Sequence, residues 1–155
     1  MRCYDSSGVL ITWRRFCEAK MLDIERNKKL NKRAVGSEYE NKAKEYLVSN
    51  GVDVIKCNYH FHKTGEIDII YYDNEFEGGN LVKYLCFCEV KYRKNDSSGS
   101  AIEAVDYRKR KNISKVAMGF VKQHNISMSQ PMRFDIVTID GDNINWIKNA
   151  FFYVQ

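Results

Sequence analysis

Two short runs place carboxylates inside sequence that otherwise favours buried β-strands. Asp68 is followed by the apolar residues 69–72, and Glu89 follows the apolar residues 85–88 and stands two positions before Lys91. A carboxylate inside a strand is costly unless a cation or a hydrogen-bond donor pairs with it. The pattern therefore predicts two neighbouring strands whose acids share a partner.

Strand geometry predicts what that partner is. Side chains at positions i and i+2 share a face, about 7 Å apart, so Glu89 and Lys91 point the same way. If the two strands pair, Asp68 and Glu89 converge on one cation, and the carbonyl of Val90 adds a third oxygen ligand. Mg²⁺ takes few carboxylates together with water and phosphate oxygens. Lys91 would then position the attacking water or neutralise charge on the phosphate in the transition state. The alternative is a solvent-facing charge pair on an edge strand.

Two further charged residues fall on apolar stripes of predicted helices. Glu40 lies on or beside the buried face of a helix over residues 36–49, where it favours a cation, either the metal or a lysine. The alternative is an ion pair with Lys44, four residues on. Lys109 interrupts the apolar stripe of a second helix, so its ammonium reaches into the site or toward a phosphate, or it is a lysine that extends past the sheet to water.

A basic cluster surrounds Lys109. Arg108, Arg110 and Lys111 flank it, and Arg93 follows Lys91 at the end of the acidic strand. Such side chains contact the phosphate backbone of nucleic acids. The same cluster is also typical of an ordinary solvated surface.

The remaining polar motifs carry weaker predictions. His60 and His62 are expected to share a strand face, but they have no third ligand with matching spacing, so phosphate contacts or plain surface are favoured over a metal site. Asp135 is expected in a structural salt bridge. The cysteines of the run Cys86-Phe87-Cys88 are expected in the core.

The pattern predicts an α/β fold with a mixed sheet flanked by helices. The expected elements are a helix over 36–49, strands over 52–57, 66–72 and 81–92, a helix over 101–124, and strands over 132–140 and from 144 to 147 or beyond. Residues 73–80 favour a turn because of Gly78 and Gly79. Residues 1–33 are expected to form a basic arm, helical or mobile, and residues 34–155 the main domain.

Composition limits the class of protein, the kind of partner and the redox compartment that the chain suits. The 155 residues include 20 aromatic side chains, counted as 2 Trp, 10 Tyr and 8 Phe, which favours a folded domain. A net charge of +5 fits a polyanionic partner without requiring one. The 5 cysteines are odd in number and lack zinc-ribbon spacing, which favours reduced thiols in the cytoplasm. No apolar run approaches the length of a membrane span.

Five motifs in one order resemble the YraN-like family of bacterial proteins. They are Gly36-x-x-x-Glu40, Gly65-Glu66-Ile67-Asp68, Glu89-Val90-Lys91-Tyr92-Arg93, Ala104-Val105 with Lys109, and Arg133-Phe134-Asp135-Ile136-Val137. This family is similar to archaeal Holliday-junction resolvases and belongs to the PD-(D/E)XK nuclease superfamily. The resemblance covers residues 34–155.

The resemblance implies a restriction-endonuclease-like αβββαβ core that hydrolyses phosphodiester bonds with Mg²⁺ or Mn²⁺. Asp68 and Glu89 match the metal ligands, Lys91 matches the catalytic lysine, and Glu40 matches the helical acid of resolvase-type members. The resemblance also implies a homodimer that acts on DNA, including branched DNA. Two alternatives stay open: a nucleic-acid-binding module with little turnover, and a protein-interaction domain that keeps the fold.

Overall fold

The computed structural model describes the backbone of residues 3–4, 10–11, 13–93 and 105–155, and the side chains of residues 21–22, 26, 34–92 and 105–155. The chain forms two compact units, Met1–Glu38 and Tyr39–Gln155. The first unit contains two short antiparallel strands, β1 (Cys3–Tyr4) and β2 (Leu10–Ile11), and most of helix α1 (Trp13–Ser49).

Helix α1 joins two stretches that were expected to be separate, the basic arm over residues 1–33 and the helix over residues 36–49. The helix expected over residues 36–49 and the helix-forming stretch before it are continuous, so the expected start at Gly36 is wrong. The end is as predicted, because Gly51 adopts a φ of +86°, a conformation that favours glycine. The expected domain boundary between residues 33 and 34 falls inside this helix and stays a prediction.

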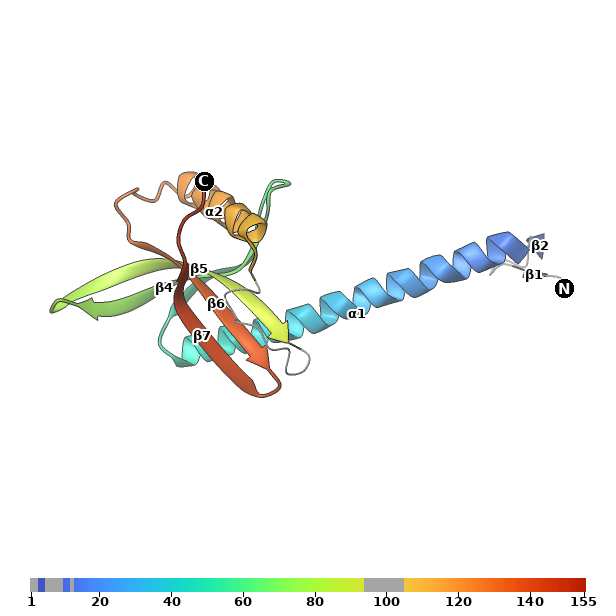
Figure 1. Cartoon of the computed structure of the whole chain (residues 1–155), viewed down its shortest axis with the longest axis horizontal. Coiled ribbons are helices and arrows are strands. Elements are labelled where there is room, and N and C mark those ends of the chain that lie inside the picture. Colours follow the sequence, from blue (N-terminus) through green and yellow to red (C-terminus); the bar gives the residue numbers. More distant parts are fainter. Residues whose placement is uncertain (1–2, 5–9, 12, 94–104) are drawn as a thin grey trace. The chain divides into compact units, whose positions relative to one another are not determined.

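The second unit is built on a five-stranded mixed sheet, shown in Figure 1. Its strands lie in chain order: β3 (Asp53–Phe61), β4 (Gly65–Glu77), β5 (Asn80–Arg93), β6 (Met132–Asp140) and β7 (Asn143–Phe151). Neighbours are antiparallel except β5 and β6, which are parallel because α2 (Tyr107–Gln123) carries the chain between them. The α/β fold is as predicted, and the order of elements is consistent with a restriction-endonuclease-like core.

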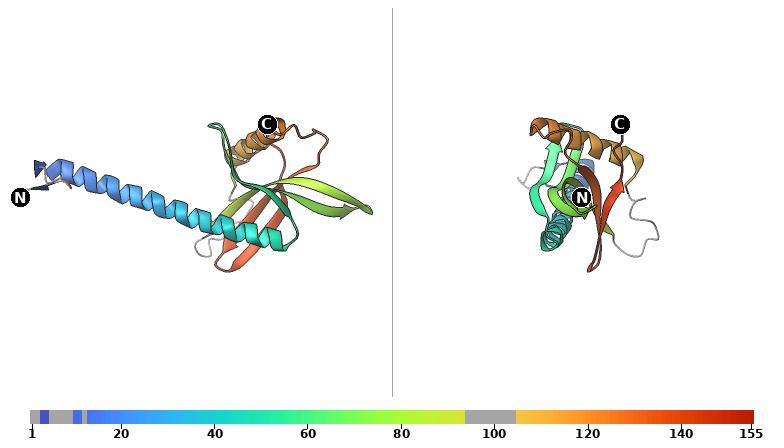
Figure 2. Two further views of the ribbon diagram at one scale, coloured as in Figure 1. Left: turned by 180° about the vertical axis from the view of Figure 1, so that it is seen from behind. Right: turned by 90° about the vertical axis from the view of Figure 1, so that its left-hand side faces the viewer.

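The two faces of the sheet are covered by different helices (Figure 2). Ile113, Val116 and Phe120 of α2 pack on one face, in a cluster that includes Phe87 of β5. On the other face, the end of α1 contributes Ala43 and Leu47 to a second cluster, whose strand members include Ile69, Tyr71, Cys86, Cys88 and Val137. The buried free thiols of Cys86 and Cys88 confirm the expectation that they lie in the core.

Two expected boundaries are wrong, each for a local reason, and a third lies outside the described residues. The expected strand over 52–57 continues to Phe61, because its register with β4 runs on to the pair Phe61 and Gly65. The expected turn over 73–80 shrinks to Gly78 and Gly79, whose φ values of +55° and +84° suit a two-residue hairpin turn. The expected helix start at residue 101 lies outside the described residues, and α2 begins at Tyr107.

The shorter turn has a visible consequence. Residues 73–77 of β4 and 80–84 of β5 pair with each other beyond the ends of β3 and β6. This hairpin projects from the sheet in Figure 1. Helix α2 starts at Tyr107 because the side chain of Asp106 accepts a hydrogen bond from the backbone N–H of Lys109, with Oδ1 and N 2.7 Å apart.

Candidate metal centre

The candidate site lies where β4 and β5 separate. Their ladder ends at the pair Ile69 and Cys88, and below it β4 pairs only with β3, while β5 continues alongside β6. Asp68 and Glu89 are the next residues on the two strands. In place of a ladder bond, the backbone N–H of Val90 donates to Asp68 Oδ2 over 2.7 Å. The sequence therefore places both acids at the point where the sheet opens.

Two lysines hold one oxygen of Glu89. Lys91 Nζ lies 2.8 Å and Lys109 Nζ 2.9 Å from Glu89 Oε1. Lys91 comes from the same strand two residues on, and Lys109 reaches across from the first turn of α2. The side chain of Glu89 is only 4% exposed, so these charge-assisted bonds offset much of the cost of burying its charge.

The other oxygen of Glu89 is buried. Among the residues that the structure describes, none donates a hydrogen bond to Glu89 Oε2, which is unusual for a buried carboxylate. With Lys91 and Lys109 on Oε1, Oε2 is the oxygen of Glu89 left for a cation. This orphaned atom is the observation that fits a divalent metal at the site.

Asp68 is poorly suited to carry a charge without a cation. Burial, and then the nearby charge of Glu89, raise the pKa of Asp68 to about 7, against smaller opposing effects from the Val90 N–H and Lys109. A bound divalent cation would favour the ionised form. The acid therefore has the environment expected of a metal ligand, as well as that of a protonated buried acid.

Glu40 is near this centre. Its charge contributes to the raised pKa of Asp68. Within the described residues, however, no three His, Cys, Asp or Glu side chains are grouped so that they could hold a metal ion, so Glu40 does not form such a group with Asp68 and Glu89. The residues that fit Mg²⁺ or Mn²⁺ are two carboxylates, a sparse set of the kind that Mg²⁺ takes together with water and phosphate oxygens. The roles of Glu40 and the Val90 carbonyl as ligands stay predictions.

The expected basic cluster divides into several environments. Lys109 faces the acids, Arg108 is exposed, and Lys111 is half-buried on α2. Arg110 instead makes contacts within the protein, because its Nε donates to the carbonyl of Val105 over 2.7 Å and its guanidinium lies 5.8 Å from the Phe151 ring. The side chain of the remaining residue, Arg93, lies outside the described residues.

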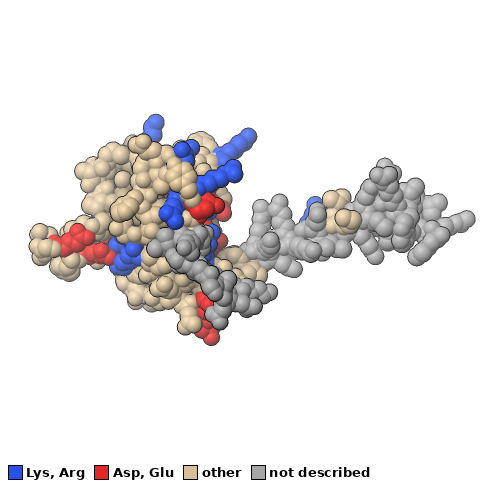
Figure 3. Space-filling model, viewed as in Figure 1, with Lys and Arg blue, Asp and Glu red and all other residues tan. Residues whose placement is uncertain are grey.

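Charge is unevenly distributed on the surface. Figure 3 shows Lys and Arg gathered over the region of α2, and Asp and Glu on the projecting hairpin. Glu75 and Glu77 are the acids near the end of that hairpin. A polyanion would therefore be attracted to the α2 side of this face, whereas Glu75 of the hairpin is already paired with Lys148.

The two histidines do not form the expected pair. His60 is on β3, but the strand ends at Phe61, and His62 has a φ of +49° in the following turn. The expectation of a shared strand face is therefore wrong. His60 Nε2 instead lies 3.3 Å from Glu66 Oε2, and both side chains are largely exposed.

A buried ion network on the face packed against α1 is larger than the sequence indicated. Arg133 Nε lies 2.8 Å from Asp135 Oδ1 and Nη2 lies 2.7 Å from Asp73 Oδ2, which confirms the expected salt bridge of Asp135. Arg133 Nη1 lies 2.8 Å from Glu75 Oε1, in ion-pair range without hydrogen-bond geometry. The i, i+2 spacing predicted the Asp135 bridge, whereas only the hairpin register could place Asp73 and Glu75.

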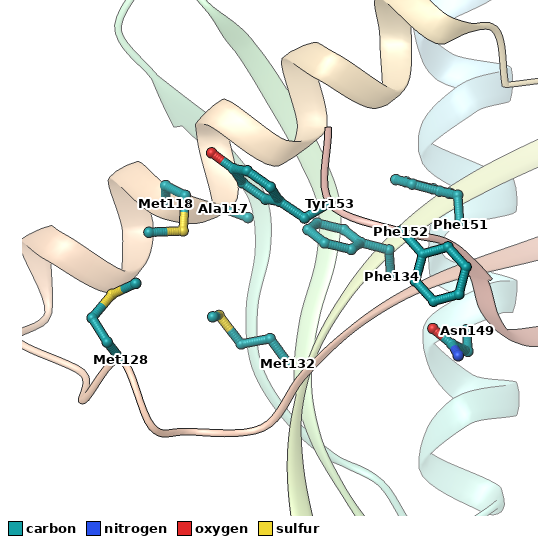
Figure 4. Close-up of a pocket in the computed structure, with 9 residues that line it drawn as sticks. All are labelled: Ala117, Met118, Met128, Met132, Phe134, Asn149, Phe151, Phe152 and Tyr153. Atoms are coloured by element: carbon teal, nitrogen blue, oxygen red, sulfur yellow. The ribbon is translucent and has the colours of Figure 1, made fainter. Parts of the chain in front are cut away.

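An apolar cavity of about 480 Å³ lies away from the acids (Figure 4). It is lined from α2, β6, β7 and their connections by Ala117, Met118, Met128, Met132, Phe134, Asn149, Phe151, Phe152 and Tyr153. None of the expected site residues lines it. Its lining contains, among the described residues, no carboxylate, lysine, arginine or histidine, and the cavity is separate from the candidate metal centre.

Comparisons with known proteins found related sequences. The sequence model of the uncharacterised protein family UPF0102 matches residues 39–139. The UPF0102 protein of Vibrio parahaemolyticus is 39% identical over 122 residues, which cover 77% of this chain and 93% of the relative. That of Fusobacterium nucleatum is 39% identical over 120 residues, which cover 77% of this chain and 92% of the relative. In the part of the chain that the structure describes, no helix has the length and apolarity needed to span a membrane. The chain therefore belongs to the uncharacterised protein family UPF0102, the YraN family that its motifs resemble.

Proposed function

We propose that the protein is a metal-dependent endonuclease that hydrolyses phosphodiester bonds in DNA. The observation that carries the proposal is the buried pair of Asp68 and Glu89, in which two lysines hold Glu89 Oε1 and no side chain or N–H of the described part of the chain donates to Oε2. A purely structural ion cluster would be expected to pair both oxygens. An acid pair that receives a cation during function leaves one free.

Asp68 and Glu89 would hold Mg²⁺ or Mn²⁺, with the Val90 carbonyl as the proposed third ligand and Glu40 acting through the metal or a second one. A metal bound there supplies an activated water and neutralises charge on the phosphate. The ammonium of Lys91, 2.8 Å from Glu89 Oε1, keeps that carboxylate in place and stabilises the negative charge that develops on the phosphate.

The substrate side of the proposal rests on charge and on the resemblance. Lys and Arg gather over α2, the helix that also delivers Lys109 to the acids, so a DNA backbone can approach the centre along this side. The resemblance to junction resolvases makes a four-way junction the first branched substrate to test, and it supports a homodimer that presents two such centres.

The test is cleavage by the purified full chain. Single-stranded, duplex and four-way-junction DNA are incubated with Mg²⁺ or Mn²⁺, and Asp68→Ala is run beside the wild type. The proposal expects metal-dependent cutting that Asp68→Ala abolishes while DNA binding persists. Asp140→Ala, an exposed acid at the end of β6, is the matched control and should cut normally. Binding without cutting in every metal would leave a nucleic-acid-binding module instead.

A further inference from the structure

A small polar pocket adjoins the candidate metal centre. Its volume is about 200 Å³, and it is lined by His60, Gly65, Glu66, Lys109 and Asn112. The cavities that enclose a whole drug-sized ligand are usually about 300–1,000 Å³. The pocket is therefore sized for one small polar group of a larger molecule.

Lys109 connects this pocket to the acids. Its ammonium lies 2.9 Å from Glu89 Oε1, and the same side chain forms part of the pocket wall. Asn112 lies three residues further along α2, on the same face of the helix. A group in the pocket would therefore be one side chain away from the group held at Glu89.

Gly65 belongs to the wall opposite α2. This glycine has a φ of +150°, a conformation that side-chain-bearing residues rarely adopt, and a Cβ there would be in ordinary contact with α2, 3.8 Å from Val116 Cγ2 and 3.9 Å from Asn112 Cβ. Beside it, His60 and Glu66 face each other as a register pair of β3 and β4. Glu66 is the one carboxylate of the wall, and its side chain is 50% exposed, so solvent screens its charge.

The donors of the pocket suit an anion. Lys109 has three N–H donors, of which Glu89 Oε1 takes one, Asn112 has two amide N–H donors, and His60, whose Nε2 lies 3.3 Å from Glu66 Oε2, has a side chain that is 65% exposed. We propose that the pocket binds the phosphate that neighbours the reacting phosphate on the same DNA strand, with Asn112 and His60 as positioning residues. This inference rests on the proposed function, since it places the reacting phosphate at Asp68 and Glu89.

The pocket gives these side chains a definite task. A strand held only at the metal could rotate about its reacting phosphate. A second phosphate fixed by Lys109, Asn112 and His60 removes that freedom. The DNA strand would then cross the point where β4 and β5 separate in one direction only. The contacts are to the backbone, so they carry no base preference.

The experiment neutralises DNA phosphates one at a time. Labelled duplex and four-way-junction DNAs carry a single methylphosphonate at successive positions, and their binding to the full chain is measured by fluorescence anisotropy in EDTA. In the wild type, one position is expected to weaken binding about five- to thirtyfold, the range of one or two lost contacts. In Asn112→Ala and His60→Ala the same methylphosphonate should weaken binding less than it does in the wild type, because one of the three contacts to that phosphate is already gone.

Asn143→Ala, an exposed asparagine at the start of β7, is the matched control and should respond like the wild type. If each methylphosphonate weakened DNA binding equally in the wild type and in all variants, the proposed phosphate site would be refuted. A failure of the protein to bind any of these DNAs would refute it as well. Cleavage mapping with Mn²⁺ separates the two proposals. Cutting without a variant-sensitive phosphate refutes the pocket and keeps the nuclease, whereas a variant-sensitive phosphate without cutting keeps the pocket and refutes the nuclease.

Discussion

Replacing Asp68 by asparagine is expected to stabilise the metal-free protein at pH 8, although the residue is proposed to be essential for activity. Asp68 is 7% exposed, and burial together with the charge of Glu89 raises its pKa from 3.8 to about 7. The folded protein therefore binds more protons at this group than the unfolded chain does between those two pH values. The stability that the protonated acid provides is fully present below pH 3.8 and is lost as the pH rises to about 7.

The magnitude follows from the two pKa values. A pKa difference of about 3, at about 1.4 kcal/mol for each, gives a penalty of about 4 kcal/mol once Asp68 is fully ionised. Asparagine keeps an oxygen that can accept the Val90 N–H, found 2.7 Å from Asp68 Oδ2, but it never ionises. The stability of Asp68→Asn relative to wild type should therefore rise from near zero at pH 4 to about 2–4 kcal/mol at pH 8.

The assay is urea denaturation in EDTA at intervals from pH 4 to pH 8.5, followed by circular dichroism. Asp73→Asn is the opposing control, because bonds from Lys148 and Arg133 outweigh burial and lower the pKa of Asp73. Its variant should lose stability relative to wild type at neutral pH, and the loss should fade as the pH falls through the acid range. If the free energy of unfolding varied with pH in the same way for wild type and Asp68→Asn from pH 4 to 8.5, the reasoning would be refuted.

Two further substitutions test the packing, both measured by urea denaturation at pH 7. A Cβ on Gly119 would lie 2.6 Å from the ring of Phe61, so Gly119→Ala should lower the free energy of unfolding by about 1–3 kcal/mol, although alanine has the better helix propensity. Adding Phe61→Leu should recover most of that loss. An unchanged urea midpoint in Gly119→Ala would contradict the close approach of Gly119 and Phe61. Arg133→Met should cost about 3–5 kcal/mol because it leaves Asp135, 0% exposed, without its cation. Lys148→Met, at a side chain 39% exposed, should cost under about 1 kcal/mol, and equal costs for the two would contradict the difference in burial.

The sequence predicted the fold because its signals were local and strong. The apolar stripe through Ile113, Val116 and Phe120 indicated the helix that covers one face of the sheet, and it does so. The parallel pairing of β5 and β6 follows from the helix between them. Boundaries were less accurate where a specific cap or turn decided them, as at Asp106 and at Gly78-Gly79.

The candidate site was predictable in its centre and less so at its edges. Period-two alternation sufficed to bring Glu89 and Lys91 to one face, and the interrupted helical stripe singled out Lys109, which does reach the acids. Sequence spacing could not show that Arg110 turns to the Val105 carbonyl, because that depends on where α2 begins. Nor could it show that the strand ends before His62.

Contacts between distant segments account for the rest. The network of Arg133 with Asp73 and Glu75 joins residues about sixty positions apart, and it depends on the register of a hairpin that the sequence had assigned to a turn. The polar pocket likewise depends on Gly65 and Asn112, which lie on different elements. Gly65 was marked only as part of the Gly65-Glu66-Ile67-Asp68 motif, and no sequence pattern marked Asn112.

The central claim is that Asp68 and Glu89 form a divalent-metal centre, and a Mn²⁺ titration followed by electron paramagnetic resonance tests it most directly. Wild type, Asp68→Asn, Glu89→Gln and the control Asp73→Asn would be compared at pH 8. The account predicts saturable Mn²⁺ binding in wild type and Asp73→Asn, and loss of that binding in both of the other variants. Mn²⁺ binding that survives Asp68→Asn and Glu89→Gln unchanged, or no binding by wild type, would contradict it.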